Sequence, residues 1–565
     1  MNYNEEMKYP WYKQYLIDEV DPNPRYFEGS MFEMLENSAL SRTSNIAYEY
    51  FGKSVTYGEF LYQVHSCAKS LKKMGIKREE KVMICLPNTP EAIIMFYAIN
   101  AIGAIAVMVH PLSAEGEIKH FIKETKVKTA LIADFSFPKF DSIKQGTTLR
   151  NVITCSVSSS MPFTMSVLYW TMKGRKTPKI PNKEGIYTWS SFMKLGNNYT
   201  KNYIVKRIGK DDAVILFSGG TTGIPKGIVL TNLNFNALAT QADSLIVTNE
   251  DDAILGILPL FHGFGLGVCT HFFMCKGVKI YLIPQISPKV IADMLKNKKP
   301  TIIVGVPTLF EAIMNTDALK KIDLSFIKHT ISGGDKLSPD LKNRFDKFLK
   351  DHKSKTVIRE GYGLTESVTA CCVTPEFRHK ENSIGIPFPG MFMKIVDVKT
   401  KEDVPFGTEG EICVAGPTIM KGYLNYKKET KMVLEKHKDG KLWLHTGDLG
   451  KMDEDGYFYF ILRLKRMIIS SGYNVYPSQI ENILNTYPDV DSSVVVGVPD
   501  PYKQQRVKAV IVLKPGVEES EKLLEDLKSL CKKNIAKYAL PSEYEFKAQL
   551  PKTLVGKIDY KELEK

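Results

Sequence analysis

The chain has 565 residues, of which 44% are hydrophobic and 25% are charged, a composition typical of globular proteins and unlike that of disordered or fibrous chains. This length allows roughly two to four domains with a large buried core. The 76 Lys and Arg residues outnumber the 63 Asp and Glu residues, which favours anionic partners, but the basic residues are spread along the chain and so indicate no nucleic acid.

The first part of the chain was compared with the patterns of signal peptides and membrane-spanning helices. The N-terminal residues are acidic, aromatic and polar, so they lack the basic start and apolar stretch of a signal peptide. Residues 92–109 form an apolar run that is long enough to approach the width of a bilayer. Because Asn100 interrupts this run and Gly103 divides it, we expect a buried helix over 91–101 and a buried strand over 105–109. A membrane span is the less favoured alternative.

Apolar runs of strand length alternate with helical patterns through most of the chain. This alternation predicts an α/β fold with largely parallel strands. The expected strands are 82–86, 130–132, 213–217, 253–258, 279–283 and 302–306, and the expected helices are 59–74, 234–246, 288–295 and 339–348.

Residues 157–181 combine an apolar cluster with a basic run. The apolar side chains include Phe163, Leu168 and Trp170. We favour an inserted loop that packs on its own domain. The alternative is a peripheral contact, in which the apolar side chains rest on a membrane surface and the basic ones face anionic headgroups.

The pattern changes after residue 385, where short strands separated by Gly, Pro and Asp turns begin, and again after residue 465, where a compact α+β block begins. We therefore expect a large N-terminal α/β domain with several subdomains (1–462), a hinge (463–466) and a small C-terminal α+β domain (467–565). The later expected strands are 393–397, 410–415, 457–461, 493–497 and 508–513, and the later expected helices are 477–486 and 520–537.

The strongest local signal is the sequence FSGGTTGIPKG at 217–227, which follows an expected strand. Glycines let the backbone come close to phosphate oxygens, hydroxyl groups donate hydrogen bonds, and the lysine adds positive charge. The spacing fits neither a Walker A loop nor a dinucleotide-binding fingerprint. The residues expected to form this phosphate loop are Ser218, Gly219, Gly220, Thr221, Thr222, Gly223 and Lys226.

This string closely resembles the phosphate loop of the adenylate-forming (AMP-binding) superfamily. Four further segments resemble that superfamily's motifs in its order: GYGLTES at 361–367, HTGD at 445–448, RLKRMIISSGYNVYP at 463–477 and PKTLVGK at 551–557. The resemblance covers most of the chain and implies the adenylate-forming fold with a mobile C-terminal domain. It is to the acyl-CoA synthetase and fatty-acid–CoA ligase branch, because amino-acid-activating relatives usually have Asp at the position of His262.

The resemblance also implies the residues that hold the phosphates of ATP. Thr221, Thr222 and Lys226 would hold the β- and γ-phosphates, which leave as pyrophosphate, and Thr365 would contact the α-phosphate. Glu366, together with Thr222, would hold Mg²⁺, a hard cation that prefers oxygen ligands.

The nucleoside site follows from the same resemblance. Asp448 would accept hydrogen bonds from the ribose hydroxyls, and Arg463 would help to fix the ribose. The backbone would approach adenine at glycines, with a tyrosine against the ring. These residues are Gly333, Gly334, Gly361, Tyr362 and Gly363.

Catalysis is implied to depend on both domains. Lys557 would neutralise the charge that develops on the α-phosphate when the carboxylate attacks it. The hinge would turn at Lys465 between two half-reactions, and Ser471 and Gly472 would then line the tunnel for the pantetheine of coenzyme A. His262 would lie near the substrate carboxylate or gate the acyl pocket, and a buried structural histidine is the alternative.

The expected acyl pocket indicates the acid, together with the segment 157–181, which would suit an acid that arrives from lipid if it faces a membrane. Its candidate linings are Phe264, Leu266, Gly267 and Val306, whose small or apolar character favours a medium- or long-chain fatty acid. Two other functions stay open: a ligase that loads an acyl carrier protein, and a catalytically silent relative that binds lipid or nucleotide. Leu462, Arg466 and Val555 depart from the family pattern at flanking positions, which bears on the hinge and turnover more than on the reaction class.

The cysteines indicate the compartment. The chain has nine, and none are spaced as CxxC. This predicts reduced core cysteines in a cytoplasmic protein. A peripheral position at the inner surface of a membrane is compatible with that location.

Overall fold

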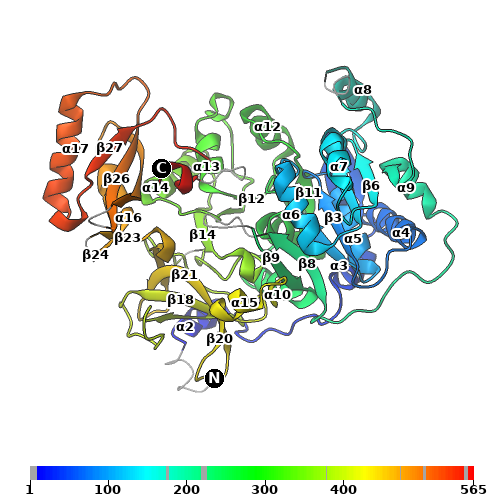
Figure 1. Ribbon diagram of the computed structural model, residues 1–565, viewed down its shortest axis with the longest axis horizontal. Helices are drawn as coiled ribbons and strands as arrows, with labels where there is room; N and C mark the ends of the chain where they lie inside the picture. Colours follow the sequence, from blue (N-terminus) through cyan, green and yellow to red (C-terminus); the bar gives the residue numbers. More distant parts are fainter. Residues whose placement is uncertain are drawn as a thin grey trace.

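Two large sheets form the body of the N-terminal part of the chain (Figure 1). The computed structural model describes residues 9–172, 177–217, 225–376, 378–470, 473–500, 504–552 and 558–564. Most neighbouring strands in both sheets are parallel, and helices pack on them. The predicted α/β class is therefore confirmed, together with a smaller C-terminal α+β unit.

The eight-stranded sheet has the order β19-β9-β8-β4-β3-β5-β6-β7. From β8 to β7 each strand is parallel to its neighbour, whereas β9 is antiparallel to β8 and to β19. The bounds are β3 (Lys81–Cys85), β4 (Ile105–Met108), β5 (Thr129–Ala133), β6 (Asn151–Cys155), β7 (Ile186–Thr188), β8 (Asp212–Phe217), β9 (Gly227–Thr231) and β19 (Gly422–Tyr423).

The nine-stranded sheet has the order β16-β15-β14-β13-β12-β10-β11-β1-β2. Its strands are parallel from β14 to β1 and antiparallel at both edges. The bounds are β1 (Ile46–Tyr50), β2 (Lys53–Thr56), β10 (Ala253–Gly256), β11 (Lys279–Leu282), β12 (Ile302–Gly305), β13 (His329–Ser332), β14 (Ile358–Tyr362), β15 (Cys372–Val373) and β16 (Ile386–Pro387).

Helix α5 (Pro90–Ala101) is the element that the apolar run predicted, and every one of its residues is buried. It packs on α3 (Met31–Leu40) and α4 (Tyr57–Lys73). The polar Asn100 is satisfied inside this core, because its Oδ1 accepts from Phe32 N at 2.8 Å and its Nδ2 donates to Asn232 Oδ1 at 2.8 Å. Among the described residues, no helix is both long enough and apolar enough to span a bilayer.

The remaining predicted helices occur with small shifts in their bounds. Helix α4 begins at a capping box formed by Thr56 and Glu59. The helix predicted over 288–295 continues as a π-helix. The bounds are α10 (Asn232–Asp243), α12 (Pro288–Asp293), η4 (Met294–Lys298), α14 (Pro339–Asp351), α16 (Pro477–Leu484) and α17 (Glu521–Asn534).

Residues 163–172 form a helix, α8 (Phe163–Met172), where we had favoured an inserted loop packed on its own domain. No residue of α8 is buried. In Figure 1 it lies at the upper right, at the edge of the molecule and apart from the sheets. Tyr169 of this helix packs, half-buried, against the main core.

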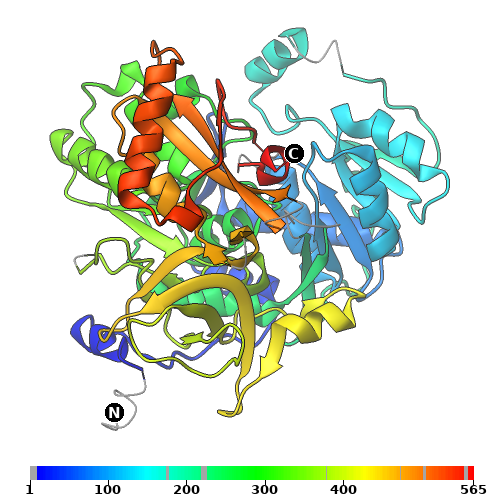
Figure 2. The same ribbon diagram turned by 60° about the vertical axis from the view of Figure 1, so that its left-hand side comes forward.

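Two further sheets follow. The third has the order β17-β18-β21-β20, with β22 paired to β21, and the fourth has the order β24-β23-β26-β25, with β27 paired to β26. In Figures 1 and 2 the fourth sheet and α17 (orange to red) lie beside the green elements and above the yellow third sheet. The bounds are β17 (Phe392–Val396), β18 (Gly410–Ala415), β20 (Leu434–Lys436), β21 (Leu442–Met452), β22 (Phe458–Arg463), β23 (Ile468–Ser470), β24 (Tyr473–Val475), β25 (Val490–Asp500), β26 (Gln504–Leu513) and β27 (Glu543–Phe546).

A single turn of 3-10 helix, η7 (Leu464–Arg466), joins the third and fourth sheets. It coincides with the expected hinge. The fourth sheet has a separate hydrophobic core, which includes Ile468, Leu484 and Leu527. This arrangement suits a small C-terminal domain that packs its own apolar residues.

Candidate functional site

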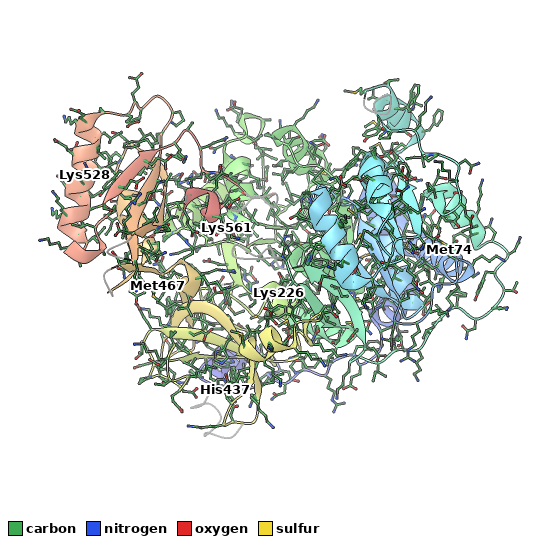
Figure 3. The ribbon with its side chains drawn as sticks, in the orientation of Figure 1. Met74, Lys226, His437, Met467, Lys528 and Lys561 are labelled. Atoms are coloured by element: carbon green, nitrogen blue, oxygen red, sulfur yellow. The ribbon has the colours of Figure 1, made fainter. Side chains whose placement is uncertain are left out.

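A large cleft, with a volume of about 1520 Å³, lies where the four sheets meet. Each sheet contributes lining residues, for example Phe217, Tyr362, Asp448 and Ser493. The cleft thus collects strand ends from both domains, which is where ligands bind in layered α/β proteins. Lys226, which is also in the lining, lies near the middle of Figure 3.

Lys226 enters the cleft from the connection between β8 and β9. These strands are paired antiparallel, with Phe217 opposite Gly227, and the expected phosphate loop lies between them in the sequence. The Lys226 Nζ lies 5.3 Å from the ring centre of Tyr423 and 5.8 Å from that of Tyr426. Both distances fit cation–π contacts. Six of the expected loop residues, namely Ser218, Gly219, Gly220, Thr221, Thr222 and Gly223, lie outside the described residues.

Tyr423 joins Lys226 to the segment that contains Thr365 and Glu366. Its hydroxyl donates to Glu366 Oε1 at 2.8 Å, and the Glu366 carbonyl accepts from Met420 N at 2.7 Å. Thr365 and Glu366 begin η6 (Thr365–Ser367) and line the cleft. The Lys226 ammonium and the Glu366 carboxylate therefore both contact Tyr423, and both residues line the cleft. Our sequence reasoning missed Tyr423, although an aromatic pair in the sequence GYLNY was a visible signal.

Asp448 is the most deeply buried acid in the cleft, with 2% of its surface exposed. Tyr362 donates its hydroxyl to Asp448 Oδ2 at 2.7 Å, and Arg463 Nε lies 3.3 Å from Oδ1. Burial raises the pKa of the Asp448 carboxyl, and the Arg463 charge opposes that rise. The Oδ1 atom is buried and accepts no hydrogen bond from the described residues. Such an atom is costly unless a ligand or water donates to it.

The predicted glycines are required for different structural reasons. Gly333 and Gly334 follow β13, and Gly334 has a φ of +81°, which favours glycine. A Cβ at Gly333 would lie 3.1 Å from the Phe264 ring and 3.2 Å from the Gly361 carbonyl oxygen. A Cβ at Gly363 would lie 1.7 Å from the Thr369 carbonyl oxygen, so protein packing alone requires glycine there.

His262 lies on the wall of the same cleft, next to the glutamate segment. A Cβ at the following residue, Gly263, would lie 1.6 Å from the Val368 carbonyl oxygen, so the two backbones are in close contact. The chain then enters η3 (Phe264–Phe272), a π-helix, a form that is frequent at functional sites. The carbonyl of His262 accepts from Leu266 N at 2.9 Å.

The apolar part of the lining agrees only partly with our expectation. Phe264 and Val306 line the cleft as predicted. Leu266 is wrong as a lining residue, because it is fully buried in the main core. Gly267 is also wrong, because a Cβ there would meet Val368 and Leu238. Further apolar lining residues include Ile246, Val268, Leu309, Val373, Ile384 and Phe388.

The C-terminal domain borders the cleft at two places. Lys465 in η7 lines it, and so do Ile558 and Tyr560. Lys552 and Ile558 pair as an antiparallel bridge. The expected residues Ser471, Gly472 and Lys557 lie outside the described residues. The cleft therefore has contributions from both domains, as the expected alternation between two half-reactions requires.

Comparisons with known proteins found related sequences. Residues 35–424 match the family described as AMP-binding enzyme, and residues 479–557 match the AMP-binding enzyme C-terminal domain. A long-chain-fatty-acid–CoA ligase of Bacillus subtilis (strain 168) is 33% identical over 97% of this chain and 96% of its own length. A long-chain-fatty-acid–CoA ligase of Escherichia coli O157:H7 is 30% identical over 99% and 98%.

Solved structures share the fold. The ATP-bound RpMatB–BxBclM chimera B1 matches with a TM-score of 0.83 and 25% identity, covering 95% of this chain and 98% of that one. A fatty acyl CoA synthetase of Mycobacterium tuberculosis matches with a TM-score of 0.71 and 24% identity, over 95% and 97%.

Proposed function

This chain belongs to the family of AMP-binding enzymes, and we propose that it activates a long-chain fatty acid with ATP and Mg²⁺ and transfers the acyl group to coenzyme A. In the first half-reaction, a carboxylate oxygen attacks the α-phosphorus, which gives acyl-AMP and pyrophosphate. In the second, the coenzyme A thiol attacks the acyl carbon and AMP leaves. The enzyme is thus an acid–thiol ligase.

The observation that carries this proposal is the buried Asp448 Oδ1, which has an ion pair with Arg463 at 3.3 Å but accepts no hydrogen bond from the described residues. A ribose hydroxyl donates a hydrogen bond to such an oxygen, and the Arg463 charge favours the ionised carboxylate. Tyr362 holds the other carboxylate oxygen, so the acid presents Oδ1 in a fixed direction. An apolar lipid alone would leave this group unsatisfied, which weighs against a relative that binds only lipid.

We assign the phosphates of ATP to the side of the cleft that Lys226 lines. We assign the β- and γ-phosphates to Lys226 and the loop before it, and the α-phosphate to Thr365. The residues present fit Mg²⁺, since the Glu366 carboxylate in the cleft wall is the hard oxygen ligand this ion prefers. When bound, the ion supplies positive charge to the triphosphate. The Tyr423 hydroxyl orients Glu366, and the Tyr423 ring contacts the Lys226 ammonium. Tyr423 therefore sets the distance between Lys226 and Glu366.

We assign the pivot between the two half-reactions to Leu464 and Lys465. Before this pair, Arg463 is fixed to Asp448 of the N-terminal domain. After it, Arg466 is fixed to the C-terminal domain by Glu481 at 2.6 Å and by the Tyr560 ring, whose centre is 4.0 Å away. Rotation there would exchange Lys557, which serves the first half-reaction, for the Ser471–Gly472 loop.

A long-chain acid is favoured by two independent features. Relatives over nearly the full length carry that name. The cleft has an apolar part, with lining residues such as Ile246, Val268 and Phe388. Burial of an alkyl chain contributes about 0.8 kcal/mol per methylene, so a longer chain binds such a wall more tightly.

We also propose a peripheral contact between α8 and the cytoplasmic surface of a membrane. Phe163 and Met172, at its two ends, are 84% and 70% exposed. A basic run follows at 173–179 in the sequence. Exposed apolar side chains beside basic ones suit an anionic lipid surface, from which a fatty acid is delivered. The cysteines are all unpaired and buried, which supports a reducing compartment.

The test is pyrophosphate release from ATP–Mg²⁺ with acids of increasing chain length, with and without coenzyme A. We expect sustained turnover with long-chain acids only when coenzyme A is present. A single turnover that coenzyme A does not extend, but an acyl carrier protein does, would make the protein a carrier-loading ligase. No release with any acid would support the silent relative.

A further inference from the structure

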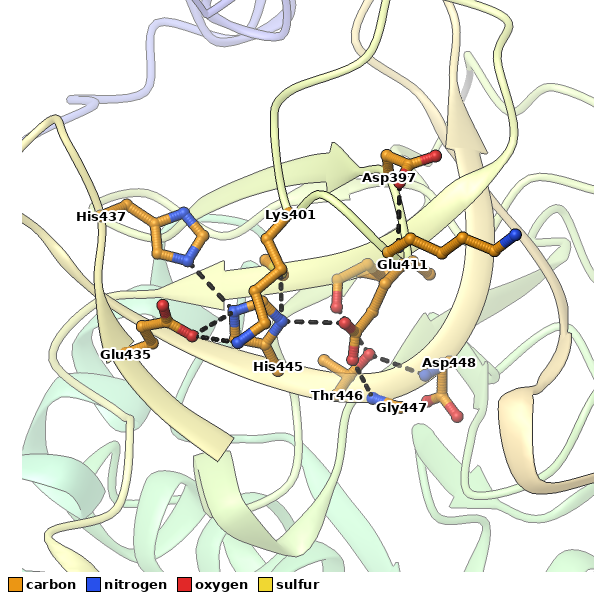
Figure 4. A network of polar contacts seen from close by, with 12 residues as sticks. Asp397, Lys401, Glu411, Glu435, His437, His445, Thr446, Gly447 and Asp448 are labelled. Carbon is orange, nitrogen blue, oxygen red and sulfur yellow. Dashed lines mark hydrogen bonds and ion pairs between the residues drawn. The ribbon is translucent and has the colours of Figure 1, made fainter. Parts of the chain in front are cut away.

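A cluster of imidazole and carboxylate groups lies on the third sheet (Figure 4). Its members are Glu435 on β20, His437 just after it, and His445 on β21, with Glu411 on β18 behind His445. The Nε2 atoms of His437 and His445 are 3.1 Å apart, and His445 Nε2 lies 3.8 Å from Glu435 Oε2. Nothing in the adenylation chemistry above uses His437 or Glu435.

Glu411 fixes the orientation of the His445 ring. Its Nδ1 lies 2.8 Å from Glu411 Oε2, and the other oxygen of Glu411 accepts from Gly447 N at 2.9 Å. An ionised carboxylate only accepts hydrogen bonds, so the proton of this imidazole is on Nδ1. The Nε2 lone pair therefore points away from Glu411, toward His437 and Glu435. Histidine ligands of metals are oriented by carboxylates in this same way.

His437 faces the Nε2 atom of His445 with its own Nε2 atom. Neutral imidazole nitrogens are common ligands of metals. The ligand atoms of Glu435, His437 and His445 all lie within 4.8 Å of one another. Two nitrogens bound tetrahedrally to zinc would be about 3.3 Å apart, close to the separation seen here.

Cys413 offers a different ligand set, which is less suitable. Its Sγ is 3.5 Å from His445 Nδ1, the atom that already serves Glu411. Glu435, His437 and the Nε2 atom of His445 are therefore the more suitable set of metal ligands.

This position already attracts a cation. The Lys401 ammonium forms an ion pair with the same oxygen of Glu435. The Lys401 side chain is 46% exposed, so it can move into solvent when a divalent ion takes its place. Glu435 is 43% exposed, which provides a path of entry from solvent.

We propose that His437, His445 and Glu435 form a binding site for a zinc-class divalent cation, with Glu411 as the carboxylate that orients His445. Two nitrogen ligands and one carboxylate leave a fourth position for water. The set discriminates against Mg²⁺, which prefers oxygen ligands in octahedral geometry. Because Glu411 also holds Gly447, an ion here would brace the part of β21 that precedes Asp448.

The experiment is a titration of the chelator-treated, full-length protein with Co²⁺, a spectroscopic substitute for Zn²⁺, without ATP. We expect one equivalent to bind with visible absorption typical of four-coordinate Co²⁺, and Zn²⁺ to displace it. His437→Gln should weaken binding at least tenfold, and Lys401→Ala should strengthen it by removing the competing ammonium. His352→Gln, at a half-buried histidine at the end of α14, is the control and should bind normally.

Equal Co²⁺ affinity in the wild type and in His437→Gln would overturn the proposal, and so would the lack of a bound equivalent in the wild type. In either case the two imidazoles share only a hydrogen bond. Circular dichroism and thermal unfolding of His437→Gln establish that the variant is folded. Since His437 is partly exposed, we expect its unfolding temperature to match the wild type within a few degrees.

Discussion

Asp448 on β21 links the third sheet to the nine-stranded sheet, because it contacts Tyr362 on β14 as well as Arg463 on β22. Asp448→Asn should raise the KM for ATP about 10- to 100-fold, because hydrogen bonds to a charged group contribute about 1.5–3 kcal/mol. Steady-state pyrophosphate release at varied ATP measures this. Asp403→Asn, at an exposed ion pair with Lys394, is the matched control and should leave the KM unchanged. An unaltered KM in Asp448→Asn would remove the ribose assignment.

Glu360, beside Gly361, gives a pH-dependent prediction. Burial raises its pKa to about 7 from the ordinary 4.5, while the Leu337 amide, 3.1 Å away, lowers it. Between these values the folded state binds the proton that the unfolded state has lost, so stability falls as pH rises. Glu360→Gln should therefore be more stable than wild type at pH 8, by on the order of 1–3 kcal/mol, and equally stable near pH 4. Denaturant unfolding at both pH values measures this, and a constant difference would contradict it.

At the scale of elements, we propose roles beyond packing for α8 and η7. For α8, Phe163→Ser with Met172→Ser should reduce binding to vesicles with anionic lipid at least tenfold, since each apolar side chain contributes about 1.5–3 kcal/mol on burial. Both side chains are exposed, so thermal stability should not change. Val247→Ser, at a residue 78% exposed elsewhere, is the control for vesicle cosedimentation. Unreduced vesicle binding in the double variant would exclude α8 as the contact.

For η7, Lys465→Pro should separate the two half-reactions. Proline fixes φ and restricts the preceding residue, Leu464, so the pivot cannot rotate. We expect acyl-AMP formation or thioester formation to slow at least tenfold in single-turnover measurements, with the other retained. Lys451→Ala, at a lysine of β21 outside the hinge, is the control and should preserve both. Wild-type rates of both half-reactions in Lys465→Pro would place the pivot elsewhere.

The elements themselves were largely predictable from sequence. The strand and helix of the apolar run, α5 and β4, occur because Asn100 and Gly103 mark the end of a buried helix and a turn. Residues 163–172 were misjudged, since an apolar helix with no buried face violates the usual pattern of helices in globular proteins.

At the scale of the whole molecule, the motifs predicted which segments meet, because their order resembles one family. They could not predict contacts between distant side chains. Tyr423 lies 57 residues from Glu366, and Glu411 lies 34 from His445. The first contact depends on the pairing of β19 with β9, and the second depends on the pairing of β18 with β21, which no local pattern specifies. Leu266 and Gly267 were misplaced for the same reason, since a π-helix shifts which residues face the cleft.

The central claim is that the carboxylate attacks the α-phosphorus of ATP. The measurement that tests it most directly uses a long-chain acid labelled with ¹⁸O in both carboxyl oxygens, with ATP–Mg²⁺ and coenzyme A, and mass spectrometry of the nucleotide and phosphate products. We predict one ¹⁸O atom in AMP and none in pyrophosphate. Label in orthophosphate, with ADP as the nucleotide product, would contradict the account, because the carboxylate would then have attacked the γ-phosphorus.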